Sequence, residues 1–256
     1  MDVNRHHLIV KLEQMAANSW PAPTQQAFEH WILRAGTGIT MRANSVLTTG
    51  SLPIVQSWMD EITAFYAALS LPLRFHISAA TDPDVDLDLE KHGLIIQSPS
   101  AVYQAACNQV LSNPIPANPL LRVQINNSLE DEWLEDFLRL EQHPYERKPA
   151  YTQIFSGIKL KICYLRIYQN EELVGLGSAV LEDGWAGLGN IITAANYRNK
   201  GIGTSIVQEL AQWSRLNGAN QLYLQVMQNN KAALNLYTRL GFTHVYDYHY
   251  RTRLNQ

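Results

Sequence analysis

Hydrophobic residues in the C-terminal half of the chain first gather in stretches of strand length. Three consecutive stretches, 160–169, 173–181 and 185–193, are strand-like. The residues between them, Asn-Glu at 170–171 and Asp-Gly at 183–184, suit tight hairpin turns. The pattern therefore predicts an antiparallel meander.

After the meander the period becomes helical. Apolar residues between 202 and 213 fall on one helical face, and Asn217-Gly218 is typical of a helix end. A strand at 221–227, a second helix at 230–240 and a strand at 242–251 follow. The predicted order after the meander is helix, strand, helix, strand.

Upstream of the meander, the pattern predicts one more strand and one more helix. Residues 121–126 alternate as a strand does, and 129–142 has helical spacing with Ser128 as the expected N-terminal cap. Just before them, residues 112–119 contain three prolines, which exclude helix interiors and central strands. We therefore predict domains at 1–112 and 120–256, joined by a linker at 113–119.

The N-terminal half repeats part of this plan. A strand at 74–78 and a helix at 84–92 precede Gly93-Leu94, which corresponds to Gly241-Phe242 at an offset of 148, since 241 minus 93 is 148. Ile54-Val55-Gln56 is also expected to open a helix, as Ile206-Val207-Gln208 does, at an offset of 152. We interpret this as a diverged internal duplication, with chance similarity as the alternative.

Composition narrows the class of protein. The chain has 256 residues, 46% of them hydrophobic and 17% charged, with a net charge of −3. We expect a folded, cytoplasmic protein without a membrane span, and the charge does not favour nucleic acid as a partner. Cys107 and Cys163 are predicted to be buried thiols. The eight histidines, including His6-His7 at an expected mobile terminus, lack ligand spacing, so no metal is predicted.

The candidate chemistry begins at the turn between the meander and the first predicted helix. This turn reads Arg198-Asn199-Lys200-Gly201-Ile202-Gly203-Thr204. Glycines at a helix N-terminus let unpaired backbone N–H groups approach an anion closely, as in a pyrophosphate cradle. The motif alone is weak, because a tight turn would use the same glycines for steric reasons.

Twenty-seven residues after Gly203 comes a second motif, which begins at Asn230 and includes Tyr237 and the Gly241-Phe242 pair. Together, the two motifs and the elements between them resemble the GNAT N-acetyltransferase superfamily. The resemblance extends over residues 121–251. It implies an α/β (α+β) fold with a mixed, mostly antiparallel sheet flanked by helices.

The resemblance also implies a function. Residues 198–204 would bind the pyrophosphate of acetyl-CoA, the strand containing Ile191 and Ile192 would bind its pantetheine arm, and Asn230 would contact that arm. Tyr237 would direct its hydroxyl to the thioester sulfur as general acid. The chain would then transfer an acetyl group to a primary amine by direct attack in a ternary complex. The expected partners are acetyl-CoA and an amine acceptor. The sequence leaves open whether the protein forms a homodimer.

The general base is not assigned from the sequence. Many relatives carry a Glu on the strand that corresponds to 187–193, whereas this strand offers only Asn190 and Thr193 as polar side chains. Asn190 could position a water molecule, and Glu182, Asp183 or Glu146 could approach from loops. The alternative interpretation of each of these three acids is an ordinary solvated residue without a catalytic role.

The N-terminal half is predicted to lack this chemistry. Residues 49–53 replace the glycine pair, and Leu89 stands where Tyr237 does. Its segments 31–34 and 40–46 resemble the degenerate N-terminal domain of tandem bacterial GNAT proteins, so two tandem copies are expected. This half would bind no CoA and would either shape the acceptor cleft or serve as a scaffold.

Two other functions compete with acetyl transfer. A CoA-binding regulatory protein without turnover would keep the glycine cradle, and the missing strand Glu favours it. Retention of Tyr237 argues against it. A P-loop or Rossmann nucleotide-binding domain would need a repeating parallel pattern and its own glycine motif, and the predicted meander disfavours both.

Overall fold

The computed structural model describes residues 3–112 and 120–253, and these divide into two compact units. The first unit comprises 3–101, 227–229 and 245–253; the second comprises 102–112, 120–226 and 230–244. Three strands contribute residues to both units: β5 (Ile95–Ala106), β11 (Thr243–Thr252) and β10 (Gln221–Met227), of which only Met227 lies in the first unit. The compact units therefore do not follow a single cut in the sequence. The predicted linker at 113–119 lies outside the described residues and stays a prediction.

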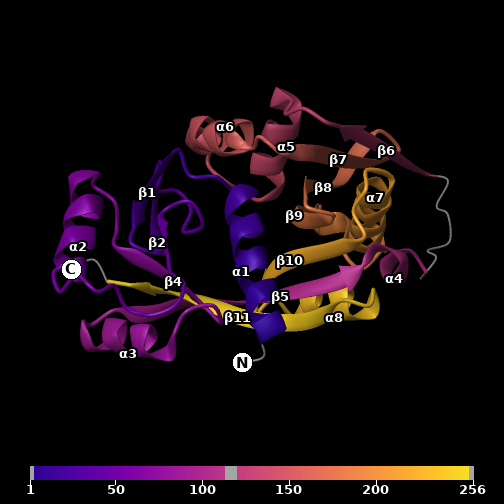
Figure 1. Cartoon of the computed structure of the whole chain (residues 1–256). Helices are drawn as coiled ribbons and strands as arrows, with labels where there is room; N and C mark the ends of the chain where they lie inside the picture. Colours follow the sequence, from indigo (N-terminus) through magenta and orange to yellow (C-terminus); the bar gives the residue numbers. More distant parts are fainter. Residues whose placement is uncertain (1–2, 113–119, 254–256) are drawn as a thin grey trace. The chain divides into compact units, whose positions relative to one another are not determined.

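The first unit is built on a mixed sheet (Figure 1). Its strands lie in the order β1, β2, β3, β4, β11. Only the β3–β4 pair is parallel among the pairs within this run, and β11 lies antiparallel to β4. The first four strands are β1 (Thr24–Phe28), β2 (Trp31–Ala35), β3 (Ser45–Leu47) and β4 (Arg74–Ser78). The final strand of the chain thus completes the sheet that contains the N-terminal strands.

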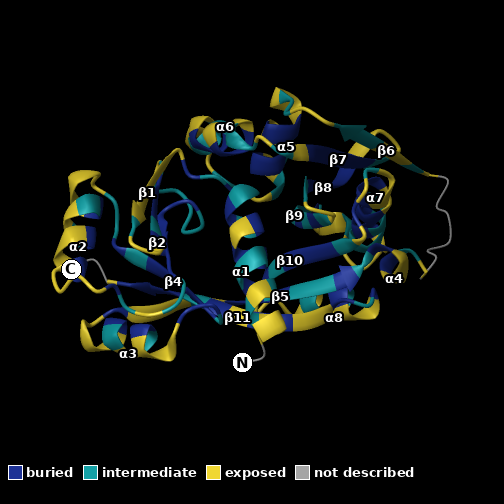
Figure 2. Ribbon diagram, viewed as in Figure 1, coloured by how far each residue is buried: buried dark blue, intermediate teal, exposed yellow. Residues whose placement is uncertain are grey.

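One face of this sheet forms an apolar core with α2 (Trp58–Ala68) and α3 (Pro83–Lys91). The rings of Trp31 and Trp58 meet edge to face with centroids 5.4 Å apart. In Figure 2, α2 and α3 carry both buried and exposed residues, as helices packed on a sheet by one side do. This core holds the strands and both helices of the unit together.

Two local predictions for this half are wrong. Ile54 does not open a helix, because the Glu29 carboxylate accepts hydrogen bonds from the Ile54 and Val55 N–H groups and holds a turn there, so α2 begins only at Trp58. His6 and His7 do not lie in an irregular terminus. They belong to α1 (Val3–Asn18), whose Ile9 and Leu12 are fully buried.

The second unit contains the predicted meander. Strands β6 (Leu121–Asn126), β7 (Lys161–Gln169), β8 (Glu172–Glu182) and β9 (Trp185–Thr193) pair antiparallel in sequence order. Both hairpin turns have positive φ at their two central residues, 50° and 63° at 170–171 and 48° and 75° at 183–184. These values are typical of type I′ turns. The meander and its turns are confirmed.

On one side of the meander, α7 (Ile202–Leu216) approaches β8 closely. A Cβ atom added at Gly175 would lie 2.8 Å from Ile206 Cδ1, and one at Gly177 would lie 2.7 Å from its Cγ2. Glycine at both positions therefore lets the helix pack against the strand. The short helix α4 (Cys107–Leu111) also packs on α7, with Gln208 Nε2 donating to the Val110 carbonyl at 3.2 Å.

Two helices that follow β6 pack through aromatic residues. They are α5 (Asp131–Leu140) and α6 (Lys148–Gly157), with a short 3-10 helix (Tyr145–Arg147) between them. The Trp133 ring stacks on Phe137 and meets Phe155 edge to face. The expected cap at Ser128 is wrong, because Glu130 is the N-cap residue.

The structure thus has the mixed α/β fold that was predicted, with helices flanking a mixed sheet. Cys107 and Cys163 are both buried free thiols, as expected.

Candidate active site

The site begins where two parallel strands stop pairing. In the second unit β9 pairs with β10 (Gln221–Met227) only as far as Leu188 and Leu224. Residues 189–193 of β9 continue to pair with β8 on the other side. One edge of β9 is therefore left without a partner strand among the described residues. Such an edge offers backbone donors and acceptors to an extended ligand that carries amide groups.

A β-bulge lies at the same point of β9. Leu176 pairs with Ile192 and Ser178 pairs with Gly189, so one residue of β8 faces two residues of β9. Asn190 in the bulge has φ of +53°, and its Nδ2 donates to Ser178 Oγ at 2.8 Å. The bulge turns β9 away from regular pairing where the free edge begins.

Ser178 was not among the predicted site residues. It is buried, and its hydroxyl also donates to the Gly189 carbonyl at 3.3 Å, so it holds the bulge from the neighbouring strand. The available signal was a hydroxyl residue within the otherwise apolar stretch 173–181.

The predicted glycine loop leads from β9 into α7. Gly201 is the residue before the helix, with φ of +84°, and no heavy atom lies within 4 Å of a Cβ placed there. The first N–H groups of an α-helix have no partner within the helix, and here they follow an exposed, open glycine. Arg198, Asn199 and Lys200 are also exposed. The loop can therefore present unpaired N–H groups and positive charge to an anion.

Two predicted members of the loop point inward instead. Ile202 is 1% exposed and belongs to the apolar core, so only its backbone is available to a ligand. A Cβ at Gly203 would lie 3.1 Å from Leu236 Cδ2 and 3.6 Å from Thr193 Oγ1. Gly203 therefore permits close packing beneath the loop, and the steric reading of this glycine is supported by the contact. Thr204 is half-buried.

The loop is fastened to β8 through an aromatic residue. Tyr197 Oη donates to Glu172 Oε2 at 2.7 Å, and Lys200 Nζ lies 5.1 Å from the centroid of the Tyr197 ring. These contacts fix the part of the loop that precedes Gly201.

The second motif forms α8 (Lys231–Arg239). Asn230 caps this helix, because its side-chain oxygen accepts from the Ala233 N–H at 3.2 Å. Tyr237 is 7% exposed and its ring lies 5.8 Å from that of Phe242. The described residues give the Tyr237 hydroxyl no hydrogen-bond partner, although the ring is held in the core.

Burial raises the pKa of Tyr237 to about 12. The phenol therefore stays protonated at neutral pH, and it is a hydrogen-bond donor. A thiolate has a pKa of about 8.5, so complete proton transfer from this phenol to it is unfavourable by roughly 3 to 4 pKa units. Donation of a hydrogen bond to the sulfur needs no such transfer.

The structure separates two of the candidate bases from this region. Asp183 lies in the β8–β9 hairpin, seven residues before Asn190, which is roughly 23 Å along an extended strand. Glu182 is the adjacent residue and lies at the same end of the strand. Glu146 is exposed in the 3-10 helix before α6. Asn190 is the candidate that lies in the bulge itself.

An antiparallel meander, a glycine-led helix and a parallel strand that separates from the meander are the architecture of the GNAT N-acetyltransferase superfamily. The family model described as "Probable histone acetyltransferase Rv0428c C-terminal" matches residues 8–253, so the chain belongs to this GNAT acetyltransferase family. The resemblance of the two motifs to GNAT proteins is thereby confirmed.

Related proteins agree with this assignment. The uncharacterized N-acetyltransferase YobR of Bacillus subtilis is 35% identical over 245 residues, which cover 96% of this chain and 98% of YobR. A GCN5-related N-acetyltransferase from Kribbella flavida has the same fold, with a TM-score of 0.73 over 98% of this chain and 96% of that one, at 15% identity. A tandem GNAT protein of clavulanic acid biosynthesis has a TM-score of 0.66 over 94% and 86%, at 12% identity.

Within the residues that the structure describes, no helix is long and apolar enough to span a membrane.

Proposed function

We propose that this protein transfers the acetyl group of acetyl-CoA to a primary amine, by direct attack within a ternary complex. The observation that carries the proposal is the conjunction at β9. The strand loses its β10 partner after Leu188, and the open turn at Gly201 follows within the same segment. A ligand with an extended amide-bearing arm and a pyrophosphate group matches these two features in that order.

Residues of the second unit would hold acetyl-CoA in three places. The free edge of β9, including Ile191 and Ile192, would pair with the pantetheine amides. The N–H groups that follow Gly201, with the exposed Arg198 and Lys200 nearby, would hold the pyrophosphate. Asn230 caps α8 with its oxygen, and its NH₂ group can donate to the cofactor arm.

When bound, acetyl-CoA supplies an activated acyl group and a thiolate leaving group. Tyr237 would donate a hydrogen bond to the sulfur as the C–S bond breaks. Because burial raises the pKa of Tyr237 to about 12, its role is electrostatic stabilisation of the developing thiolate more than complete proton delivery. The thiolate then leaves as such or takes its proton from water.

The acceptor must lose a proton before attack. An alkylammonium with a pKa of about 10.4 is only ~0.1% neutral at pH 7, which costs about 4.6 kcal/mol. Asn190 commits its Nδ2 to Ser178, which leaves Oδ1 as an acceptor for a water molecule or for the amine. We propose that this oxygen positions the proton-accepting water in place of the absent strand Glu.

A thiol-release assay with acetyl-CoA against a panel of amines, amino acids and peptides tests this proposal. Turnover of a primary amine supports it and identifies the acceptor class. Other acyl-CoA donors in the same panel define the acyl group. Tight CoA binding without release of thiol for any acceptor would favour the second candidate, a CoA-binding regulatory protein.

We also propose that the two halves descend from one duplicated unit. The helix ends of α3 and α8 make the same bonds at an offset of 148. The Leu94 N–H bonds to the Leu89 carbonyl at 3.1 Å, and the Phe242 N–H bonds to the Tyr237 carbonyl at 3.0 Å. Both helices are followed by a glycine with positive φ, 77° at Gly93 and 90° at Gly241.

Within that proposal the N-terminal half has lost CoA binding. Leu89, at the position that corresponds to Tyr237, is an apolar residue that is 0% exposed in the core of the first unit. Calorimetry on a variant with Gly201→Val, which blocks the cradle of the second unit, tests this. Residual CoA binding would contradict it.

A further inference from the structure

The sheet of the first unit has two unlike faces. Paired residues on neighbouring strands present their side chains to the same face, and successive residues alternate between faces. The pairs Arg34–Ser45, Leu47–His76 and His76–Tyr250 therefore place four polar residues on one face, together with Leu47. Arg74 and Tyr248 lie on it as well, since each is two residues from His76 or Tyr250. The opposite face is the apolar core that packs on α2 and α3.

Helix α1 places an acidic residue on this polar face. Glu13 is 2% exposed, and its Oε2 lies 2.6 Å from Nε2 of His76. Burial alone raises the pKa of Glu13, but His76 and Tyr246 outweigh burial and leave the pKa below its usual value. The His76 ring stacks on that of Tyr248 with centroids 4.7 Å apart. The polar face is therefore buried, ordered and charged.

A guanidinium group is buried on the same face. Arg34 is 5% exposed, and its Nη2 donates to the carbonyls of Ala17 and Trp20 at 3.1 Å and 2.7 Å. These two bonds fix the orientation of the guanidinium group. Arg42 reaches toward the same region, with its Cζ 3.7 Å from the centroid of the Trp20 ring.

Several polar atoms of this face are buried without a hydrogen-bond partner. They are Arg34 Nε, Arg74 Nε and Nη1, Tyr250 Oη and Glu13 Oε1. A buried polar atom without a partner costs about 1–3 kcal/mol, more when it is charged, so groups of such atoms indicate a missing partner. Four of these five atoms are donors. The missing partner must therefore be rich in acceptors.

The charges agree with the donor count. Arg34, Arg42 and Arg74 bring three positive charges to this region, and Glu13 brings one negative charge that already faces His76. A guanidinium group binds carboxylate and phosphate groups with good geometry. A cation would find only one carboxylate oxygen.

We propose that the polar face of the first unit, formed by Glu13, Arg34, Arg74, His76, Tyr248 and Tyr250, binds a small molecule through its carboxylate or phosphate group. Arg34 Nε, Arg74 and the Tyr250 hydroxyl donate to the oxyanion. The remaining oxygen of Glu13 accepts from a donor group elsewhere on the ligand, so a compound that also carries an ammonium group binds more tightly than a simple acid.

The site is tested by titrating the full-length protein with acetate, glycine, glutamate, succinate and inorganic phosphate. Binding is monitored through the NMR signals of the arginine Nε–Hε groups and through the melting temperature. Carboxylates or phosphate should shift the Arg34 and Arg74 signals along a common saturation curve. Comparing the affinity for the carboxylates with the affinity for phosphate shows which oxyanion the site prefers. Glycine should bind more tightly than acetate if Glu13 takes part. Neither CoA nor turnover is needed, so the result is independent of the proposed acetyl transfer.

Tyr250→Phe removes one donor and keeps the ring, and it should weaken binding about tenfold. Tyr103→Phe, the same change in a half-buried tyrosine of the second unit, should leave the affinity unchanged. If Tyr250→Phe fails to fold, Arg74→Gln serves instead, because Arg74 is only partly buried. Arginine signals that do not respond to any of these anions would mean that water fills the site and would overturn the proposal. Equal affinities of both tyrosine variants and the parent protein would also overturn it.

Discussion

At the scale of single residues, the candidate active site depends on backbone conformations that few residues adopt. Asn190 and Gly201 both have positive φ, and they lie on either side of the strand end at Thr193. Asparagine tolerates this conformation better than most residues, and glycine has no Cβ to oppose it. One residue shapes the bulge in β9, and the other opens the turn into α7.

Gly201 can be tested against a matched glycine at the other end of the same helix. Gly201 and Gly218 both have positive φ, 84° and 98°, and a Cβ at either meets no heavy atom within 4 Å. Changing either residue to Ala should therefore lower stability by about 1 kcal/mol. Only Gly201→Ala should also weaken CoA binding, by roughly tenfold, because its methyl group faces the expected pyrophosphate. Calorimetry measures the CoA affinity of both variants. Equal CoA affinities of Gly201→Ala and Gly218→Ala would show that the turn at Gly201 does not bind the pyrophosphate.

Gly203 is a poorer test of the cradle. A side chain there meets Leu236 at 3.1 Å, so loss of CoA binding in a Gly203 variant could result from disturbed packing between α7 and α8.

Tyr237→Phe tests the hydrogen bond to the thioester sulfur. The ring keeps its place beside Phe242, so CoA affinity should change little, while kcat falls by about 100-fold. Because burial raises the pKa of Tyr237 to about 12, the parent enzyme should show no loss of rate from this group below about pH 11. Tyr168→Phe, on β7, provides the control. A parent-like kcat for Tyr237→Phe, with chemistry limiting, would make Tyr237 a core residue only.

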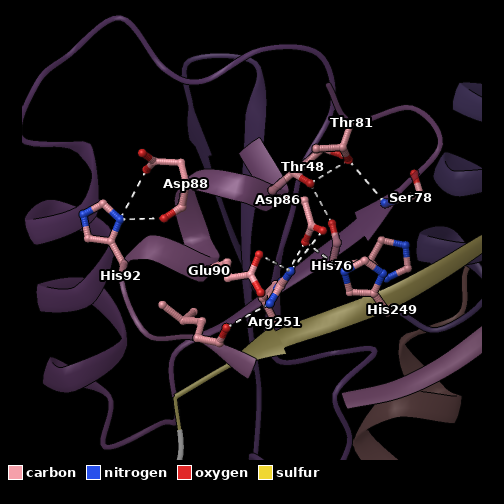
Figure 3. Close-up of polar contacts among 11 residues, drawn as sticks. Thr48, His76, Ser78, Thr81, Asp86, Asp88, Glu90, His92, His249 and Arg251 are labelled. Carbon is pink, nitrogen blue, oxygen red and sulfur yellow. Dashed lines mark hydrogen bonds and ion pairs between the residues drawn. The ribbon is translucent and has the colours of Figure 1, made fainter. Parts of the chain in front are cut away.

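At the scale of elements, an ionic cluster ties the last strand of the chain to α3 (Figure 3). Arg251 Nε and Nη2 donate to the two carboxylate oxygens of Asp86 at 2.7 Å and 3.1 Å, and Arg251 Nη1 donates to the Leu94 carbonyl at 3.1 Å. His249 Nε2 lies 2.9 Å from Asp86 Oδ1. Arg251 is only 4% exposed, so its partner matters for stability.

Asp86→Asn should destabilise the protein by about 2 kcal/mol at pH 7, because it leaves the buried Arg251 without its carboxylate. Burial alone raises the pKa of Asp86, but Arg251 and His249 outweigh it and hold the pKa below its usual value. A carboxyl with a lowered folded-state pKa stabilises above its unfolded pKa of about 4, and this contribution is lost as the pH falls through the lowered pKa. Denaturant unfolding should therefore show parent and variant converging below pH 4.

Asp88→Asn on the same helix is the matched control. Asp88 pairs with the partly exposed His92 at 3.3 Å, so its loss should change stability by less than about 0.5 kcal/mol. Equal effects of the two substitutions at pH 7 would show that the Arg251 cluster has no special role.

At the scale of the whole molecule, the compact units are not consecutive pieces of chain. Residues 102–111 belong to the second unit, where Val102, Ala105, Cys107 and Val110 are buried. Residues 245–252 belong to the first unit, where β11 pairs with β4. Each unit therefore depends on a segment that a cut at the predicted linker would remove.

A fragment of residues 120–256 should not fold by itself. It lacks the buried residues of 102–111, including α4, whose contacts cover α7. Restoring these residues in a fragment of 102–256 should improve folding, as judged by the cooperativity of thermal unfolding. Deletion of 245–256 from the full chain should unfold the first unit, because it removes the partner of β4. A stable, cooperative 120–256 fragment would show that the linear domain boundary is sufficient.

Most elements of the second unit were predictable because their signals are local. Turn residues at 170–171 and 183–184, the glycine before α7 and the asparagine before α8 act on backbone within four residues of themselves. Helix α1 was missed because one of its buried positions is polar: Glu13 faces the charged sheet surface and is as buried as Met15, so the apolar spacing of the helix is incomplete.

The sequence by itself determined the meander, the glycine-led helix, the capped α8 and the family to which they point, since each depends on neighbouring residues and on hydrophobic period. Only the tertiary structure decided where β9 leaves β10, which unit contains each part of β5 and β11, and that Arg34, Arg74 and Glu13 share a buried face. These features depend on which distant segments pair. No local pattern specifies the partner of a strand, because pairing is chosen by the burial and backbone hydrogen bonds of the whole sheet.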